Sequence, residues 1–157
     1  MKSKHISPLL WLALAVATSS QAVQVNFSGG LIESVPCTIS GGQLLQLDFG
    51  NAVIIRNLNG VNYSKPINYQ ITCADVGTVH LTLKGTETSF DDAAIQTNVV
   101  GLGIRVNRGG VPFTLNTPIV VDPASPPVLE AVPVADPANT PATGVFNATA
   151  TLMADYQ

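Results

Sequence analysis

The sequence predicts an all-β sandwich, and three observations support this fold class. Val, Thr, Asn, Gly and Pro are abundant after the first 22 residues, a composition that favours strands and turns over helices. Short β-prone runs recur between Gly and Pro clusters, and no helical periodicity separates them. Near the C-terminus, every second residue from 144 to 156 is apolar or small, which is typical of a half-buried strand.

The first 22 residues have the composition of a secretory signal peptide. A basic start at Lys2 and Lys4 precedes an apolar run from Leu9 to Ala17, and small residues surround a cleavage position after Ala22. The apolar run has roughly ten residues, whereas a transmembrane anchor needs about 20. We therefore expect export and cleavage, which leave a single domain of about 135 residues.

The expected strands are short and are separated by turn residues. Asn107-Arg108-Gly109-Gly110 between two apolar runs is a hairpin signal. A single helical turn is expected at Asp91 to Gln96. The runs with strand character are Leu44–Phe49, Ile67–Cys73, Val79–Leu83, Val99–Val106, Pro118–Val121, Leu129–Val134 and Gly144–Tyr156.

Cys37 and Cys73 are the two cysteines of the chain. Export to an oxidising compartment makes a disulfide between them the expected state. Closing a loop of about 37 residues stabilises a fold by roughly 4 kcal/mol in the chain-entropy model. The two thiols and His80 are too few ligands for a metal site, so no metal is expected.

The mature chain offers no constellation for catalysis or for nucleic-acid binding. Its five Lys and Arg stand against ten Asp and Glu, a net charge of about −5, without a basic patch. His80 lies in an expected strand, where it should face outward, and no Ser occupies a nucleophile elbow. Asp91-Asp92 is expected to be solvated loop. We expect no enzymatic activity, no cofactor and no small-molecule substrate.

Both ends of the mature chain carry period-two segments with an apolar face. At the C-terminus this face consists of Gly144, Phe146, Ala148, Ala150, Leu152, Ala154 and Tyr156. At the N-terminus it consists of Val23, Val25, Phe27, Gly29 and Leu31. The N-terminal segment is either an ordinary first strand of the sandwich or a segment that buries its face elsewhere, and the pattern alone leaves both open.

In their order and spacing, these features resemble the pilins of the chaperone-usher pathway. The matching motifs are Val23-Gln24-Val25-Asn26-Phe27-Ser28-Gly29, Pro36-Cys37-Thr38-Ile39, Asp48-Phe49-Gly50, the second cysteine and the terminal strand. Gly144 and Tyr156 stand fourteen residues from the end and at the penultimate position, where the family has glycine and tyrosine. The resemblance covers the whole mature chain and is greatest to minor tip or adaptor subunits of P-pilus-type fimbriae.

The resemblance implies an incomplete immunoglobulin-like β-sandwich that lacks its last strand and is completed in trans by donor-strand exchange. It implies a signal peptide at 1–22, a donor-strand extension at 23–34 and a pilin domain at 35–157. In this scheme the apolar positions from Val23 to Leu31 form the donor face. Those from Gly144 to Tyr156 line the acceptor groove and form the chaperone-binding strand.

The implied partners are a periplasmic pilus chaperone, an outer-membrane usher, neighbouring pilin subunits and a tip adhesin. The implied location is a fimbrium on the Gram-negative cell surface, reached through the periplasm. The competing hypothesis is a self-contained periplasmic or surface binding domain that completes its own sandwich. The two hypotheses differ in self-association, because a pilin should form SDS-resistant oligomers and a binding domain should be a folded monomer.

Overall fold

The computed structural model describes residues 27–29, 37–74 and 77–156. The chain divides into two units, Met1–Ile32 and Glu33–Gln157, and all strands given below belong to the second unit. The expected signal peptide, the expected boundary at residue 35 and the donor positions Val23, Val25 and Leu31 lie outside the described residues. No helix in the described part is long and apolar enough to cross a membrane.

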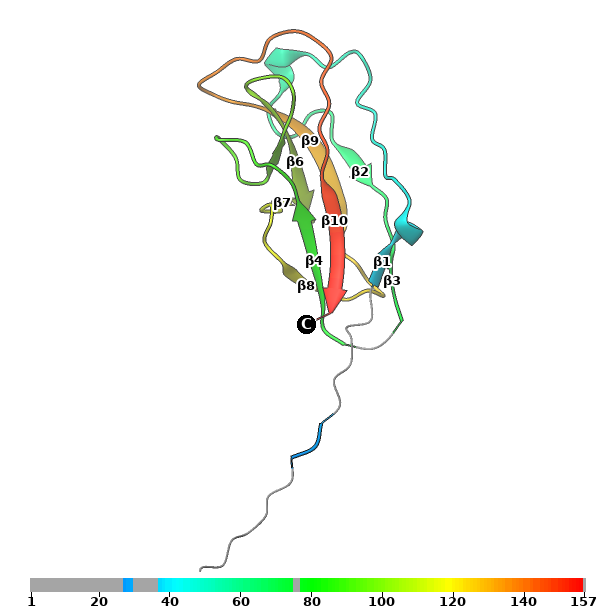
Figure 1. Ribbon diagram of the computed structural model, residues 1–157. Helices are drawn as coiled ribbons and strands as arrows, with labels where there is room; N and C mark the ends of the chain where they lie inside the picture. Colours follow the sequence, from blue (N-terminus) through cyan, green and yellow to red (C-terminus); the bar gives the residue numbers. More distant parts are fainter. Residues whose placement is uncertain (1–26, 30–36, 75–76, 157) are drawn as a thin grey trace, which may run out of the picture. The chain divides into compact units, whose positions relative to one another are not determined.

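Three antiparallel strands form the first sheet of the second unit. β4 (Val79–Lys84) lies in the centre, between β8 (Ile119–Val121) and β10 (Thr151–Tyr156). Across β4 and β10, Leu83 stands opposite Leu152 and Leu81 opposite Ala154. Figure 1 shows β10 in red beside the green β4.

The second sheet has the strand order β2-β9-β6-β5, and the short strand β7 also pairs with β6. The hairpin turn between β6 and β7 consists of Gly109 and Gly110, with φ of +55° and +84°. These dihedrals suit glycine in a two-residue turn, so the predicted turn is confirmed. The bounds of the strands are Lys65–Ile67 for β2, Leu129–Ala135 for β9, Leu102–Arg108 for β6, Ala94–Gln96 for β5 and Val111–Pro112 for β7.

A two-stranded sheet lies at one margin of the sandwich. It pairs β1 (Cys37–Ile39) with β3 (Ile71–Cys73), antiparallel. Two short 3-10 turns follow along the chain, η1 (Ser40–Gly42) and η2 (Ile55–Asn57).

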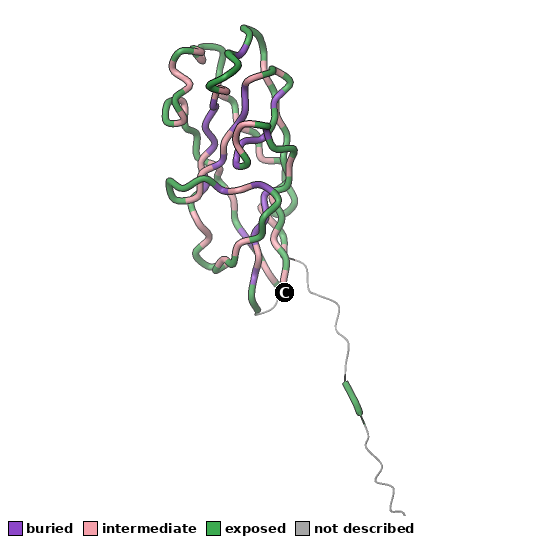
Figure 2. The backbone as a smooth tube through the Cα atoms, turned by 90° about the vertical axis from the view of Figure 1, so that its left-hand side faces the viewer, coloured by how far each residue is buried: buried purple, intermediate pink, exposed green. Residues whose placement is uncertain are grey.

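The main core takes side chains from both large sheets. Leu81 of β4 is 0% exposed, and Val106 of β6 and Leu129 of β9 are each 1% exposed. A second, smaller cluster contains Val132 and Val134, which alternate along β9 with the residues that face the main core. Buried positions are concentrated in β4, β6 and β9, and Figure 2 draws the buried stretches of the backbone in purple.

Several predicted strands agree with the structure. Val79–Leu83, Pro118–Val121 and Leu129–Val134 correspond to β4, β8 and β9 with ends that differ by one residue. The predicted strand Val99–Val106 starts too early, because Val99–Leu102 is a turn closed by the bond from Leu102 N–H to the Val99 carbonyl.

Two other predictions are wrong. Ile67–Cys73 is not one strand: β2 ends at Ile67 and pairs with β9, whereas β3 begins at Ile71 and pairs with β1. The chain therefore changes sheets within a run that is rich in strand-favouring side chains such as Ile67, Tyr69 and Ile71. The helical turn expected at Asp91 to Gln96 is a β-turn closed by the Ala94 N–H and the Asp91 carbonyl, and β5 begins directly at Ala94.

The two segments that flank the later site also differ from prediction. Leu44–Phe49 forms no ladder with another described strand, although Leu45, Leu47 and Phe49 are half-buried between exposed neighbours. The terminal run Gly144–Tyr156 is paired only from Thr151 onward, as β10. Its partner β4 ends at Lys84, opposite Thr151, so the ladder stops there while the alternation of side chains continues toward Phe146.

Candidate functional site

The candidate site is an apolar groove along β10. Among the described residues, β10 forms a ladder with β4 alone. On its other side lies β1, close to β10 in space but not joined to it by a ladder, as Figure 1 shows. The groove follows this gap and has a volume of about 1660 Å³.

The terminal segment forms one wall of the groove. Phe146, Ala148, Leu152 and Ala154 are half-buried and pack on the main core, whereas Thr151 between them is exposed. Six of the seven residues that the sequence placed on this face line the groove, namely Gly144, Phe146, Ala148, Ala150, Leu152 and Ala154. The seventh, Tyr156, packs its ring against Gly77, where an added Cβ would come within 2.8 Å of the ring.

The opposite wall consists of β1 and the unpaired segment that follows it. Its apolar lining residues include Ile39, Leu45, Leu47, Phe49 and Val53. Among the described residues, positions 44–53 take part in no backbone ladder, and Gly50 N–H donates to the Asp48 side chain at 2.7 Å. The sequence predicted a strand at Leu44–Phe49 but gave no sign that this segment faces the terminal strand.

The floor of the groove is the main core itself. Leu83 of β4, Ile104 and Val106 of β6, and Leu129 of β9 all contribute to it. Phe49 and Phe146 meet from the two walls with ring centroids 5.9 Å apart and planes tilted by 43°. Such a tilted arrangement is favourable for aromatic rings.

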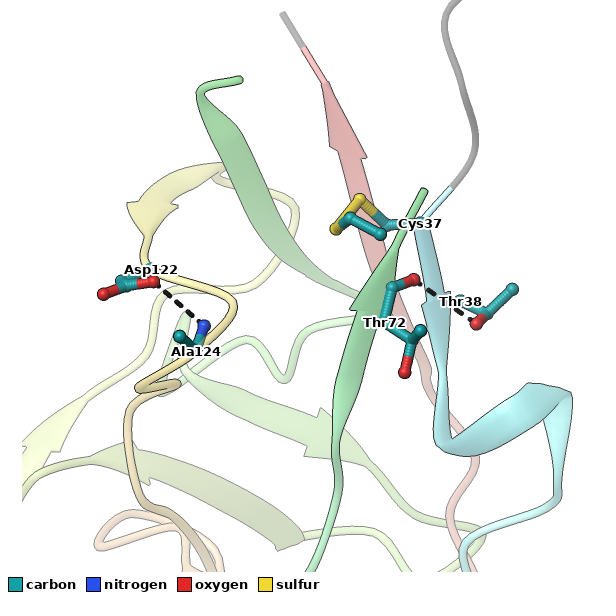
Figure 3. Close-up of a disulfide and its surroundings, with 6 residues drawn as sticks. Cys37, Thr38, Thr72, Asp122 and Ala124 are labelled. Carbon is teal, nitrogen blue, oxygen red and sulfur yellow. Dashed lines mark hydrogen bonds between the residues drawn. A yellow bond between two sulfur atoms is a disulfide. The ribbon is translucent and has the colours of Figure 1, made fainter. Parts of the chain in front are cut away.

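The predicted disulfide is confirmed and fixes one end of the groove. Cys37 and Cys73 stand opposite each other in the β1-β3 ladder and are bonded. Next to them, Thr38 Oγ1 donates to the Thr72 carbonyl at 3.4 Å, as Figure 3 shows. Cys37 lines the groove, so the bond attaches that wall to β3.

The structure also describes the polar residues that were considered for metal binding or catalysis. No group of three or more His, Cys, Asp or Glu is arranged to hold a metal in the part of the chain that the structure describes. Asp91 is not solvated loop as expected, because it accepts a hydrogen bond from Arg105 Nε at 2.6 Å. His80 alternates with the buried Val79 and Leu81, and it is half-buried rather than fully exposed.

The part of the N-terminal segment that the structure describes consists of Phe27, Ser28 and Gly29. All three are exposed, and the Phe27 side chain is 93% exposed.

Comparison with known proteins places these features in a family. The family model described as fimbrial protein matches residues 25–157, which include every strand and the whole groove. This chain belongs to the fimbrial protein family. A relative from Escherichia coli strain K12, the uncharacterized fimbrial-like protein YfcQ, is 39% identical over 98% of this chain and 99% of its own length. Fimbrial proteins are structural subunits, so the protein is not an enzyme.

Solved structures of fimbrial subunits share the fold. The P pilus adaptor subunit PapF matches with a TM-score of 0.58 and 24% identity, covering 80% of this chain and 98% of PapF. The P pilus rod subunit PapA matches with a TM-score of 0.60 and 22% identity, covering 85% of this chain and 100% of PapA. A chain from a chaperone-usher pilus matches with a TM-score of 0.58 and 21% identity, covering 91% of this chain and 100% of the pilus chain. The all-β fold of this fimbrial protein is therefore that of pilin subunits.

Proposed function

We propose that this fimbrial protein is a structural subunit of a chaperone-usher fimbria, an incomplete immunoglobulin-like sandwich whose groove receives a strand from another chain. The observation that carries the proposal is the groove between β10 and the unpaired segment at 44–53. β10 has a ladder partner on one side only, and the segment across the groove has none among the described residues. A strand laid between two such edges gains main-chain hydrogen bonds along them, and alternate side chains enter the apolar groove.

The floor and walls make this addition energetically substantial. Leu83, Ile104 and Val106 present apolar surface to the groove. Each large apolar side chain that is fully buried contributes roughly 1.5 to 3 kcal/mol. Three or four such side chains give a gross gain on the order of 5 to 10 kcal/mol, from which the cost of ordering the inserted strand is subtracted. The stability of the subunit is therefore expected to depend on an occupant.

The occupants that we propose come from two sources. During export, the periplasmic chaperone inserts a strand along the terminal strand. In the assembled fimbria, the N-terminal extension of the next subunit replaces it at the outer-membrane usher. The extension at 23–34 of this chain, with Val23, Val25, Phe27, Gly29 and Leu31 as the donor face, in turn enters the groove of the subunit before it. The 93% exposure of Phe27 supports this role, because insertion would bury that ring.

Within the fimbria, we propose a minor tip or adaptor position, next to neighbouring pilins and a tip adhesin. The proposal rests on the segment before Cys37, which resembles that of minor tip subunits. The fold similarity supports a pilin of either kind, since the TM-scores to the adaptor PapF and the rod subunit PapA are nearly equal. Immunogold labelling should accordingly mark fimbrial tips, and labelling along the whole shaft would indicate a rod subunit.

Electrophoresis without boiling tests strand exchange itself. The full chain, produced with the chaperone and usher of its own fimbria, should give a ladder of SDS-resistant species that collapses on boiling. Phe27→Asp should abolish the contacts in which this subunit is the donor, because an inserted carboxylate costs several kcal/mol when it is buried unpaired. Ser28→Asp, at the neighbouring position, is the matched control and should keep the ladder. A stable folded monomer would instead favour a self-contained binding domain.

A further inference from the structure

The terminal segment loses its ladder partner before it reaches Phe146. β4 pairs with β10 up to the register position of Lys84 and Thr151. The next residue after β4, Gly85, still lies against Ala150. A Cβ added to Gly85 would be 3.4 Å from the Cβ of Ala150. Beyond Ala150 no strand accompanies the chain among the described residues, yet Phe146 and Ala148 keep the alternation of the wall.

Asn98 takes the place of the missing ladder. Its Oδ1 accepts a hydrogen bond from Asn147 N–H at 2.7 Å, and its Nδ2 donates to the Val145 carbonyl at 3.2 Å. The Asn98 backbone N–H also donates to the Asn147 carbonyl, at 3.3 Å. The side-chain amide has one donor group and one acceptor, so it supplies what a peptide unit of a neighbouring strand would supply. These three bonds hold the backbone on both sides of Phe146.

Asn98 is itself attached to a fixed turn. Thr97, which is 8% exposed, donates from Oγ1 to the Leu102 carbonyl at 2.9 Å and accepts at Oγ1 from Val99 N–H at 3.0 Å. Val99 and Leu102 line the groove. The turn that carries Asn98 therefore borders the groove and is held in place by the hydrogen bonds of Thr97.

The two walls differ at the point where they meet. Phe146 stands between backbone groups that Asn98 holds, whereas Phe49 belongs to the segment at 44–53 without ladder bonds. We infer that Asn98 is a positioning residue of the strand-accepting groove: it extends the wall of β10 past the end of β4 and directs Phe146 at the inserted strand. This inference rests on the proposed function and adds to it a residue outside the terminal strand.

The test uses the chain with a second copy of Val23–Leu31 fused behind Gln157. A long flexible linker lets the copy enter the groove in either direction. In the otherwise unchanged chain the fusion should raise Tm. In Asn98→Ala the rise should be clearly smaller, and amide exchange at Asn147 should be about tenfold faster, since one hydrogen bond is lost there. Amide exchange at Leu152 should not change. Asn98→Asp keeps the acceptor for Asn147 N–H, so its rise in Tm and its exchange rate at Asn147 should lie between those of the unchanged chain and Asn98→Ala.

Asn116 provides a matched control. Its Nδ2 donates to the Gly85 carbonyl at 3.0 Å and its Oδ1 accepts from Gly85 N–H at 3.3 Å, so its side-chain amide also makes two backbone bonds, but to Gly85 and not to the backbone on either side of Phe146. Its φ of +60° suits glycine, and Asn116→Gly should leave the rise in Tm and exchange at Asn147 unchanged. Equal behaviour of Asn98→Ala and the unchanged chain would overturn the role of Asn98. No rise in Tm on fusion in the unchanged chain would instead count against the proposed function.

Discussion

At the scale of single residues, the alternation along the terminal segment separates two classes of side chain. Leu152 is half-buried and packs on the main core, and its neighbour Thr151 is exposed. This difference follows from strand geometry, in which successive side chains point to opposite faces. The sequence was sufficient to predict this difference in burial, because the alternation is a local property.

The two neighbours therefore predict opposite effects of the same substitution. Leu152→Asp should strongly reduce co-purification with the periplasmic chaperone, because a carboxylate in the apolar groove costs several kcal/mol. Thr151→Asp should leave the yield of the complex close to that of the unchanged chain. Pull-down of tagged chaperone measures both variants, and equal losses would contradict the assignment of the groove face.

At the scale of elements, β1 depends on its attachment to β3. β1 has three residues and, in the described part of the chain, one ladder partner, so few backbone bonds hold this wall of the groove. The disulfide between Cys37 and Cys73 closes the ladder at one end. Two cysteines in an exported chain were enough to predict the bond, whereas the ladder that surrounds it depends on where β3 lies.

Removal of the disulfide should accordingly affect stability and assembly together. The double variant Cys37→Ser, Cys73→Ser should lower the free energy of unfolding by about 4 kcal/mol, the value for a loop of this length in the chain-entropy model. Denaturant titration of the fused chain measures the loss. Ser40→Ala, in the turn after β1, serves as a control that leaves the bond in place. A change under 1 kcal/mol in the double variant would contradict the role of the bond.

At the scale of the whole molecule, the crossing between the sheets carries a half-buried tyrosine. Tyr69 lies between β2 and β3, and its hydroxyl donates to the Pro127 carbonyl at 2.7 Å. Burial raises the pKa of Tyr69 from 10.0 to about 12. The folded state therefore favours the neutral phenol more than the unfolded state does.

This shift predicts the alkaline stability of the protein. Below pH 10 the contribution of Tyr69 is complete, and it should be lost as the pH rises from about 10 through about 12, because the unfolded chain releases the proton first. Tyr69→Phe should remove this part of the pH dependence and lower the stability at pH 7 by about 1 kcal/mol through the lost hydrogen bond. Unfolding in urea at pH 7, 10 and 11.5 measures both effects, with Tyr63→Phe as the control. An unchanged slope above pH 10 in Tyr69→Phe would contradict the assignment.

The sequence by itself determined the all-β class, the positions of β4, β8 and β9, the glycine turn between β6 and β7, and the disulfide. These features depend on local composition, on period-two patterns and on cysteine chemistry, all of which are readable along the chain. The tertiary structure decided where ladders end and what replaces them. Leu44–Phe49 favours strand but forms no ladder with a described strand, and Asn98 completes a wall formed by residues almost fifty positions away. Pairing of distant segments is fixed by packing around a common core, and no local pattern contains that information.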